Sequence, residues 1–297
     1  MNIDNQEWRE LSVEEHKQRA LNILLEIDAF CRKENLRYFL AYGTLIGAVR
    51  HKGFIPWDDD IDIQMPRPDY EVFAKKFNNV KHESNYMAFY PTDKRAKHTY
   101  MKVCDMDTRK IESGIKYYNN DYLGVDIDIF PLDGLPEDDK KYKRHFRKIK
   151  LLSYRFFGVN SILYLGDLKL NLSGFLKLVY RFCVIQRGKL LNLVNGSANR
   201  DEILKTLTEV ETEIPYDEAK IVGTSCSIYD FFDDRYPKEC FETSLEAQFE
   251  GHNVKIPGGY DTILTKQYGE YMTPPPENQQ ITHHSNNVYV KKKVYNI

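Results

Sequence analysis

A chain of 297 residues with 42 % hydrophobic and 29 % charged residues has the composition of an ordinary soluble protein, which excludes general disorder. The five cysteines include no C-x-x-C pair and are odd in number, so neither a zinc ribbon nor a disulfide framework is predicted and a reducing cytoplasm is expected. No signal peptide is predicted, and no stretch approaches the roughly 20 apolar residues that cross a bilayer. We therefore expect a cytoplasmic protein that is either soluble or peripheral on the inner face of the membrane.

The net charge of -2 is unevenly distributed. Between Lys141 and Arg200 there are 13 Lys and Arg but one acid, Asp167, so this segment carries +12 and the rest of the chain -14. Such a basic block favours an anionic partner. Its apolar and basic stretch 168–182 suits a helix in an anionic membrane interface, or equally an ordinary helix packed on a catalytic core. No nucleic-acid partner is expected, because the chain contains no recognised nucleic-acid-binding module.

The first elements are predicted from their boundaries. Ser12-Val-Glu-Glu15 has the spacing of a capping box, which predicts a helix that begins there and ends near Asn35. The run 37–41 predicts a strand. Gly43-Thr44 predicts a turn that leads into a brief helix through Arg50.

Alternation then predicts strands at 61–65, 100–104 and 125–130, with a helix at 70–78 after the first of them. Residues 140–198 are predicted to be mostly helical, with breaks at Gly166 and Gly174, and short strands and Pro-rich turns are expected from Val222 onward. Mixed strands and helices indicate the α/β (α+β) class. The predicted organisation is a catalytic core at 1–139, a basic aromatic helical segment at 140–200, and a part that completes the catalytic domain at 201–297.

The most informative pattern is the acidic pair Asp60 and Asp62. Two carboxylates at i and i+2 of a strand share one face, while Ile61 and Ile63 face the core. Carboxylate oxygens bind divalent cations, and two cations about 3.5–4 Å apart are the arrangement that stabilises phosphoryl transfer.

A third acid from a neighbouring strand normally completes such a site. Asp128 is the candidate, and Asp126, on the same face of its strand, is the alternative. The turn at Gly43 and Thr44 offers backbone N–H groups and a hydroxyl to phosphate oxygens.

The acidic run 58–60 has two other interpretations. It can be a solvated loop, as most acidic runs are. A calcium loop of the EF-hand kind is excluded, because Ile63 occupies the required glycine position and Asp69 the final glutamate position.

Four motifs resemble the hallmarks of one family. They are GTLIGAVR at 43–50, HKGFIPWDDDID at 51–62, DIFPLD at 128–133, and YGEYM at 268–272 followed by Pro274-Pro275. They are similar to the LicD family, which includes bacterial phosphocholine transferases and is related to the fukutin group of sugar-phosphate transferases. The resemblance spans residues 12–284, and residues 50–62 are its most specific part.

The resemblance implies a nucleotidyltransferase-type mixed sheet with flanking helices and a basic helical insertion. It also implies transfer of a phosphorylated alcohol, foremost phosphocholine from CDP-choline, onto a hydroxyl of a cell-surface glycan such as teichoic acid or lipopolysaccharide, or onto its lipid-linked precursor, with release of CMP. CDP-linked ribitol or glycerol phosphate are alternative donors. Asp60, Asp62 and Asp128 would bind Mg²⁺, with Mn²⁺ as the alternative, and Asp128 is the candidate general base. A non-catalytic nucleotide- or glycan-binding module on the same fold is the competing interpretation; it gains little from keeping all three acids.

Several further residues are candidate substrate contacts. Arg50, His51 and Lys102 are candidates for the diphosphate, and Trp57 for stacking on the base or on choline. Alternatively Arg50 pairs with an acid, Lys102 faces solvent and Trp57 only packs. One departure from the family is the run 277–283, which lacks the basic residue common before the closing histidine, and no fukutin-type zinc insertion is predicted.

Overall fold

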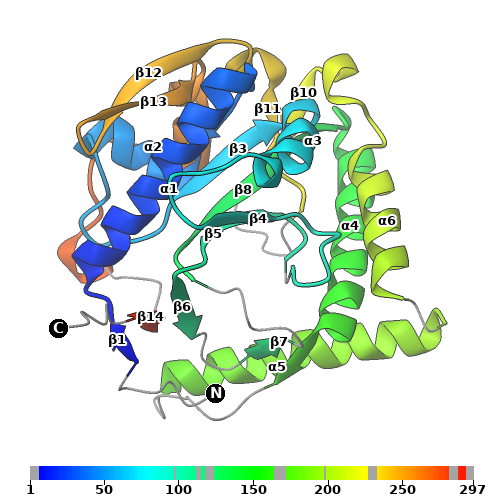
Figure 1. Cartoon of the computed structure of the whole chain (residues 1–297). Coiled ribbons are helices and arrows are strands. Elements are labelled where there is room, and N and C mark those ends of the chain that lie inside the picture. Colours follow the sequence, from blue (N-terminus) through cyan, green and yellow to red (C-terminus); the bar gives the residue numbers. More distant parts are fainter. Residues whose placement is uncertain are drawn as a thin grey trace.

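A mixed seven-stranded sheet forms the centre of the computed structural model (Figure 1). The structure describes residues 7–96, 98–111, 115–117, 124–163, 172–196, 199–226, 233–280 and 287–291. The strands of the sheet are β2 (Phe39–Leu40), β3 (Asp62–Pro66), β4 (Tyr86–Phe89), β5 (Met101–Asp105), β8 (Asp126–Leu135), β10 (Ile221–Gly223) and β11 (Tyr236–Pro237). Their order is β11-β10-β8-β3-β2, with β5 beside β8 and β4 beside β5; β3 and β8 are parallel and the other pairs antiparallel. The predicted α/β class is confirmed.

Helix α1 (Val13–Glu34) begins at the predicted capping box. The Ser12 hydroxyl accepts a hydrogen bond from the Glu15 N–H at 3.2 Å, and the Glu15 carboxylate accepts one from the Ser12 N–H at 3.0 Å. The helix ends at Asn35, whose left-handed conformation, with φ of 55°, closes it. Its buried side chains contact β5 and β8, so α1 covers one face of the sheet.

The segment from the end of β2 to α3 follows the predictions with two shifts. Helix α2 (Tyr42–Ile46) continues into one π-helical turn, η1 (Gly47–His51). Helix α3 (Arg67–Lys76) begins before the predicted residue 70, because Pro68 lies in its first turn, where no N–H is needed, and η2 (Phe77–Asn79) follows it.

Two predicted strand boundaries were wrong. Asp60 lies outside β3, which begins only at Asp62. Strand β8 continues past the predicted end at residue 130 to Leu135. Pro131 falls between the parts of β8 that pair with β5 and with β10, where its missing N–H is tolerated.

The basic segment contains two long helices, α4 (Asp139–Asn160) and α5 (Leu172–Val194). Gly174 lies inside α5, so the break predicted there was wrong, and Gly166 lies outside the described residues. Helix α6 (Arg200–Glu211), which was not predicted, packs on α4 through a second apolar cluster. The members of this cluster are Ile149, Leu152, Phe156, Ile203, Leu204 and Leu207.

The remaining elements lie around this frame. They are the sheet of β1 (Trp8–Glu10), β14 (Asn287–Lys291) and β6 (Thr108–Ile111), the pair β7 (Ile115–Tyr117) and β9 (Ser161–Leu163), the hairpin β12 (Ser244–Phe249) and β13 (His252–Pro257), helix α7 (Tyr260–Tyr268), and the turns η3 (Tyr216–Glu218), η4 (Lys238–Phe241) and η5 (Glu277–Gln279). Helix α7 was not predicted. The C-terminal part supplies β10 and β11 to the central sheet, while the three-part division of the chain stays a prediction. Within the described residues, every helix falls short, in length or in apolar character, of what a membrane crossing requires.

Candidate functional site

The two predicted acidic strands lie side by side. In the parallel pair of β3 and β8, Asp62 is directly opposite Asp128, and Ile63 is opposite Ile129. Directly opposed side chains on adjacent strands project from the same face, with the strands about 4.8 Å apart. Ile63 and Ile129 are fully buried, so they anchor the other face in the core. The chain fold therefore brings together two acids that are 66 positions apart in the sequence.

Asp62 is surrounded by other carboxylates. Its backbone N–H donates to the Thr44 hydroxyl at 2.9 Å, which ties the start of β3 to α2. Burial, and then the negative charges of Asp60, Asp128 and Asp58, raise the pKa of Asp62 well above its usual range. These acids therefore repel one another, and a cation bound among them would be favourable.

The acidic run 58–60 is half-buried rather than a fully solvated loop. The Asp58 carboxylate lies against Gly43, where an added Cβ would be only 2.6 Å from Asp58 Oδ2. Asp59 lies 3.8 Å from the His16 ring and is not among the principal groups that shift the pKa of Asp62. Gly43 thus gives Asp58 room beside the acidic pair, a contact that the sequence did not predict.

Lys102 faces the acids, so the interpretation that it faces solvent was wrong. Its side chain is buried, its Nζ lies 3.2 Å from Asp126 Oδ1, and it also forms a close ion pair with Asp128. The register explains this, because Lys102 lies opposite Asp128 in the antiparallel pair of β5 and β8. Tyr100, two residues earlier, donates its hydroxyl to Asp128 Oδ2 at 3.1 Å. Strand alternation from Lys102 was the signal that could have found Tyr100.

The two acids of β8 are held differently. Against the effect of burial, Lys102 and Lys110 hold the pKa of Asp126 well below its usual range; Lys110 Nζ, from β6, lies 3.3 Å from Asp126 Oδ1. Burial and the charge of Asp126 raise the pKa of Asp128, and Lys102 opposes them. Asp128 acts on Asp62 electrostatically, whereas Asp126 is not among the principal groups that do. No sequence signal pointed to Lys110.

Arg50 joins two of the motifs. Its Nη1 donates to the Tyr271 carbonyl oxygen at 2.5 Å, and its Nε donates to the His51 ring at 2.9 Å. Among the described residues it has no ion pair, so the expected pairing with an acid is not seen. The His51 and Trp57 rings meet edge to face with centroids 6.4 Å apart, and Trp57 packs against the core. Diphosphate and base contacts for these residues stay predictions.

Tyr268, at the end of α7, lies within electrostatic range of the same acids. Desolvation of its phenol, and then the charges of Asp62, Asp234, Asp58 and Asp60, raise its pKa. This places the start of the YGEYM motif at 268–272 near the site, although the sequence assigned Tyr268 no role of its own. His283, which closes the final motif, lies outside the described residues.

The chain was compared with known proteins. Residues 35–157 match the family described as "LicD/FKTN/FKRP, nucleotidyltransferase domain", a range that includes Asp62, Lys102 and Asp128. The lipopolysaccharide cholinephosphotransferase LicD of Haemophilus influenzae (strain Rd) is 30 % identical over 283 residues, which are 95 % of this chain and 99 % of that protein. This chain belongs to the LicD family.

Two shorter matches are to uncharacterized proteins of Rickettsia. One, from Rickettsia prowazekii (strain Madrid E), is 32 % identical over 120 residues, 37 % of this chain and 41 % of that protein. The other, from Rickettsia typhi, is 39 % identical over 62 residues, 18 % of this chain and 20 % of that protein. Of these three matches, the Haemophilus one extends along nearly the whole of both chains.

The acids of this LicD-family chain are candidate ligands of a metal ion. Within the described part of the chain, no group of three or more His, Cys, Asp or Glu side chains is arranged to hold a metal ion. At Asp128, Lys102 takes the position next to Oδ1. Asp60 and Asp62 still offer oxygen donors of the kind that Mg²⁺ prefers, and their mutual repulsion with Asp58 fits a bound divalent cation.

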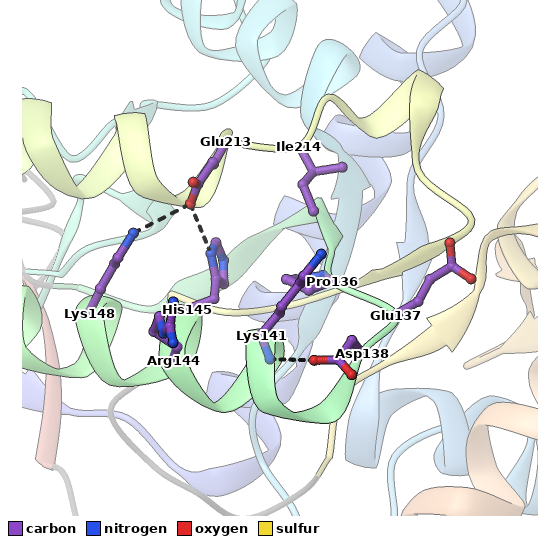
Figure 2. A pocket seen from close by; sticks show the side chains of 9 residues that line it. All are labelled: Pro136, Glu137, Asp138, Lys141, Arg144, His145, Lys148, Glu213 and Ile214. Atoms are coloured by element: carbon purple, nitrogen blue, oxygen red, sulfur yellow. Dashed lines mark hydrogen bonds and ion pairs between the residues drawn. The ribbon is translucent and has the colours of Figure 1, made fainter.

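A surface cavity of about 510 Å³ lies at the other end of β8 (Figure 2). It begins at Pro136, just after the strand, whereas Asp128 lies near the strand's start; ten residues of strand span about 33 Å. Glu213 points toward His145, at 3.6 Å, and Lys148, at 3.8 Å, so acids and bases pair across it. This cavity is separate from the acidic site.

Proposed function

We propose that this LicD-family protein is a metal-dependent transferase that moves phosphocholine from CDP-choline onto a hydroxyl of a lipopolysaccharide-type glycan. The observation that carries the proposal is the match, over nearly the full length of both chains, to a protein named as a lipopolysaccharide cholinephosphotransferase. The opposition of Asp62 and Asp128 on adjacent parallel strands, with Lys102 of β5 opposite Asp128 on the other side of β8, supports it.

In the proposed reaction the acceptor hydroxyl oxygen bonds to the phosphorus distal to cytidine. The bond from that phosphorus to the bridging diphosphate oxygen breaks, CMP leaves, and the hydroxyl proton passes to a carboxylate of the cluster, with Asp128 as candidate. Tyr100 and Lys102 contact the two Asp128 oxygens and fix that carboxylate.

Asp60 and Asp62 would hold the cation, Mg²⁺ or Mn²⁺, which supplies positive charge opposite the transferring phosphoryl group. Asp128 would also bind the cation only if its ion pair with Lys102 lengthened. Lys102 could then contact the diphosphate. Because the acids repel one another, cation binding should also stabilise the fold.

The test is CMP release from CDP-choline, CDP-ribitol and CDP-glycerol, each with Mg²⁺ or Mn²⁺, with and without lipopolysaccharide. We expect release that requires CDP-choline, the glycan and a cation, and that EDTA stops. Release from another CDP-alcohol alone would redirect the donor assignment. No release from CDP-choline with either cation would contradict the proposal.

Asp60→Asn and Asp62→Asn test the acidic pair. Losing a metal ligand removes several kcal/mol of transition-state stabilisation, so we expect turnover to fall about 100-fold or more. Asp59→Asn is the matched control, because Asp59 faces His16, and it should keep turnover within about twofold. The melting temperature of Asp62→Asn should not fall, because one repelling charge is gone, and Mg²⁺ should raise it less than in the wild type. Near-normal turnover in either pair variant would refute the assignment.

A further inference from the structure

Helix α5 presents an apolar face to solvent. Its inner side, around Ile185, Gly188 and Asn192, is buried. At 100° per residue the opposite side, which includes the exposed Gln186 and Cys183, carries large apolar side chains. They are Leu176, 58 % exposed, Val179, 42 %, Leu190, 60 %, Leu193, 81 %, and Val194, 74 %, and together with Phe175, 58 %, they are called the outer face of α5.

The orientation of this face is fixed by the crossing of α4 and α5. A Cβ at Gly188 would lie 2.0 Å from the Tyr154 carbonyl oxygen and 2.8 Å from Gly158 Cα, so the two backbones are in direct contact. Any rotation of α5 would push a side chain into this contact. The outer face therefore stays outward, at the end of the molecule where α5 lies (Figure 1).

The charge on α5 has one sign. The helix contains Lys177, Arg181, Arg187 and Lys189 and no Asp or Glu. Arg187 and Lys189 are exposed and lie on opposite flanks of the outer face, and the Arg187 guanidinium also lies over the Tyr154 ring of α4, 4.6 Å from the ring centroid. An apolar stripe between basic flanks is the pattern of a helix that lies in an anionic membrane surface.

The structure divides the basic block of the sequence. The cluster 141–150 lies on the first half of α4, at least eight residues, or about 12 Å, from the crossing at Gly158. Those residues and the outer face of α5 are therefore separate surfaces. Within the basic block 141–200, the surface that suits a membrane is therefore the outer face of α5.

We propose that α5 docks in the plane of an anionic phospholipid bilayer, with its outer face among the acyl chains and Arg187 and Lys189 at the headgroups. A second copy of this chain fits the face less well, because two such helices would bring basic side chains together with no acid on either. Strand β8 begins on the side of the sheet toward α5 and ends where α4 starts (Figure 1), so docking places Asp128 toward the bilayer. If the proposed function holds, this suits a lipid-linked acceptor.

The experiment is flotation of the full chain with phosphatidylcholine vesicles, with and without phosphatidylglycerol, at low and high salt. We expect binding to the anionic vesicles that weakens with salt. Leu190→Gln/Leu193→Gln should lower the partition coefficient at least about tenfold. Arg187→Gln/Lys189→Gln should lower it on the order of 30-fold on anionic vesicles, since each basic residue contributes about 1 kcal/mol there.

The matched control is Val13→Gln/Leu245→Gln, which also removes two exposed apolar side chains, 58 % and 44 % exposed, away from α5. It should bind as the wild type does. Three results would overturn the proposal. They are no flotation with anionic vesicles at low salt, an equal loss of vesicle binding in the control variant, or a dimer in light scattering that Leu190→Gln/Leu193→Gln converts to a monomer. Flotation needs no substrate, so its outcome is independent of the CMP assay. The α5 variants should also keep wild-type turnover on a delipidated, soluble glycan.

Discussion

At the residue scale, Lys102 supplies the positive charge that offsets the negative charges of Asp126 and Asp128. The sequence alone does not show whether a lysine on a strand faces solvent or pairs with an acid on the neighbouring strand. The pairing of β5 with β8 settles it here, because the register brings Lys102 onto Asp128 and within 3.2 Å of Asp126. A buried cation between a buried acid, Asp126, and a half-buried one, Asp128, is stabilising only while all three are present.

Lys102→Met should therefore be strongly destabilising. It leaves Asp126 and Asp128 without their shared partner, and breaking a buried pair in this way costs about 3–5 kcal/mol. The free energy of unfolding from urea titration checks it. Lys205→Met, at a side chain 79 % exposed, is the control and should change it by less than about 0.5 kcal/mol. A loss below about 1 kcal/mol for Lys102→Met would mean that this ion pair contributes little.

At the element scale, three elements meet at one buried arginine. Arg67 of α3 contacts both oxygens of Asp133 of β8, at 2.6 and 2.7 Å, and Glu211 of α6 at 3.1 Å. Asp133 ends the DIFPLD motif, so the second acid of that motif has a structural contact while Asp128 lies at the site. Burial, opposed by Arg67, raises the pKa of Glu211 to about 8.

Glu211 makes stability depend on pH. Between its ordinary pKa near 4.5 and about 8, the folded chain keeps a proton that the unfolded chain has lost, so the free energy of unfolding falls as pH rises, by up to about 1.4 kcal/mol per pH unit. Glu211→Gln keeps the hydrogen bond from Arg67 and removes this slope. Urea titrations from pH 5 to 9 should show the variant gaining on the wild type as pH rises. A constant difference would show that Glu211 is already ionised throughout.

The crossing of α4 and α5 predicts the effect of one methyl group. Gly188→Ala places a Cβ against the Tyr154 carbonyl oxygen, so the helices must separate, at a cost of about 1–3 kcal/mol that exceeds the gain in helix propensity. Gln186→Ala, exposed on the same helix, should instead be neutral or slightly stabilising. Urea unfolding of both variants measures the difference. Equal stability of the two would mean that the crossing yields without strain.

At the scale of the whole molecule, local sequence patterns predicted those helices and strands whose formation depends on residues close together in the sequence. The capping box at Ser12 and the alternation around Ile63 and Ile129 gave α1, β3 and β8, and the strands brought Asp62 and Asp128 together as expected. Other contacts between side chains of different segments were not predictable. Lys110 and Asp126 come from different strands, and Arg67 and Glu211 are 144 residues apart.

The unpredicted helices have a related cause. Helix α6 holds its apolar positions against α4, and α7 starts directly after a Pro-Gly-Gly turn that read as an irregular segment. The sequence of neither helix indicates which element the helix packs against. The inward side of α5 likewise became distinguishable from its outer face only through the contact of Gly188 with Gly158.

The small sheet of β1, β14 and β6 ties both ends of the chain to the site. Trp8 pairs with Lys291, and on its other edge β14 places Val288 opposite Lys110, the residue whose ammonium contacts Asp126. A protease cut just before residue 287 would thus leave every acid of the cluster intact. It would nevertheless remove the hydrogen-bonding partner of β1 and β6. Lys110, some 180 positions upstream, would then be held less firmly against Asp126.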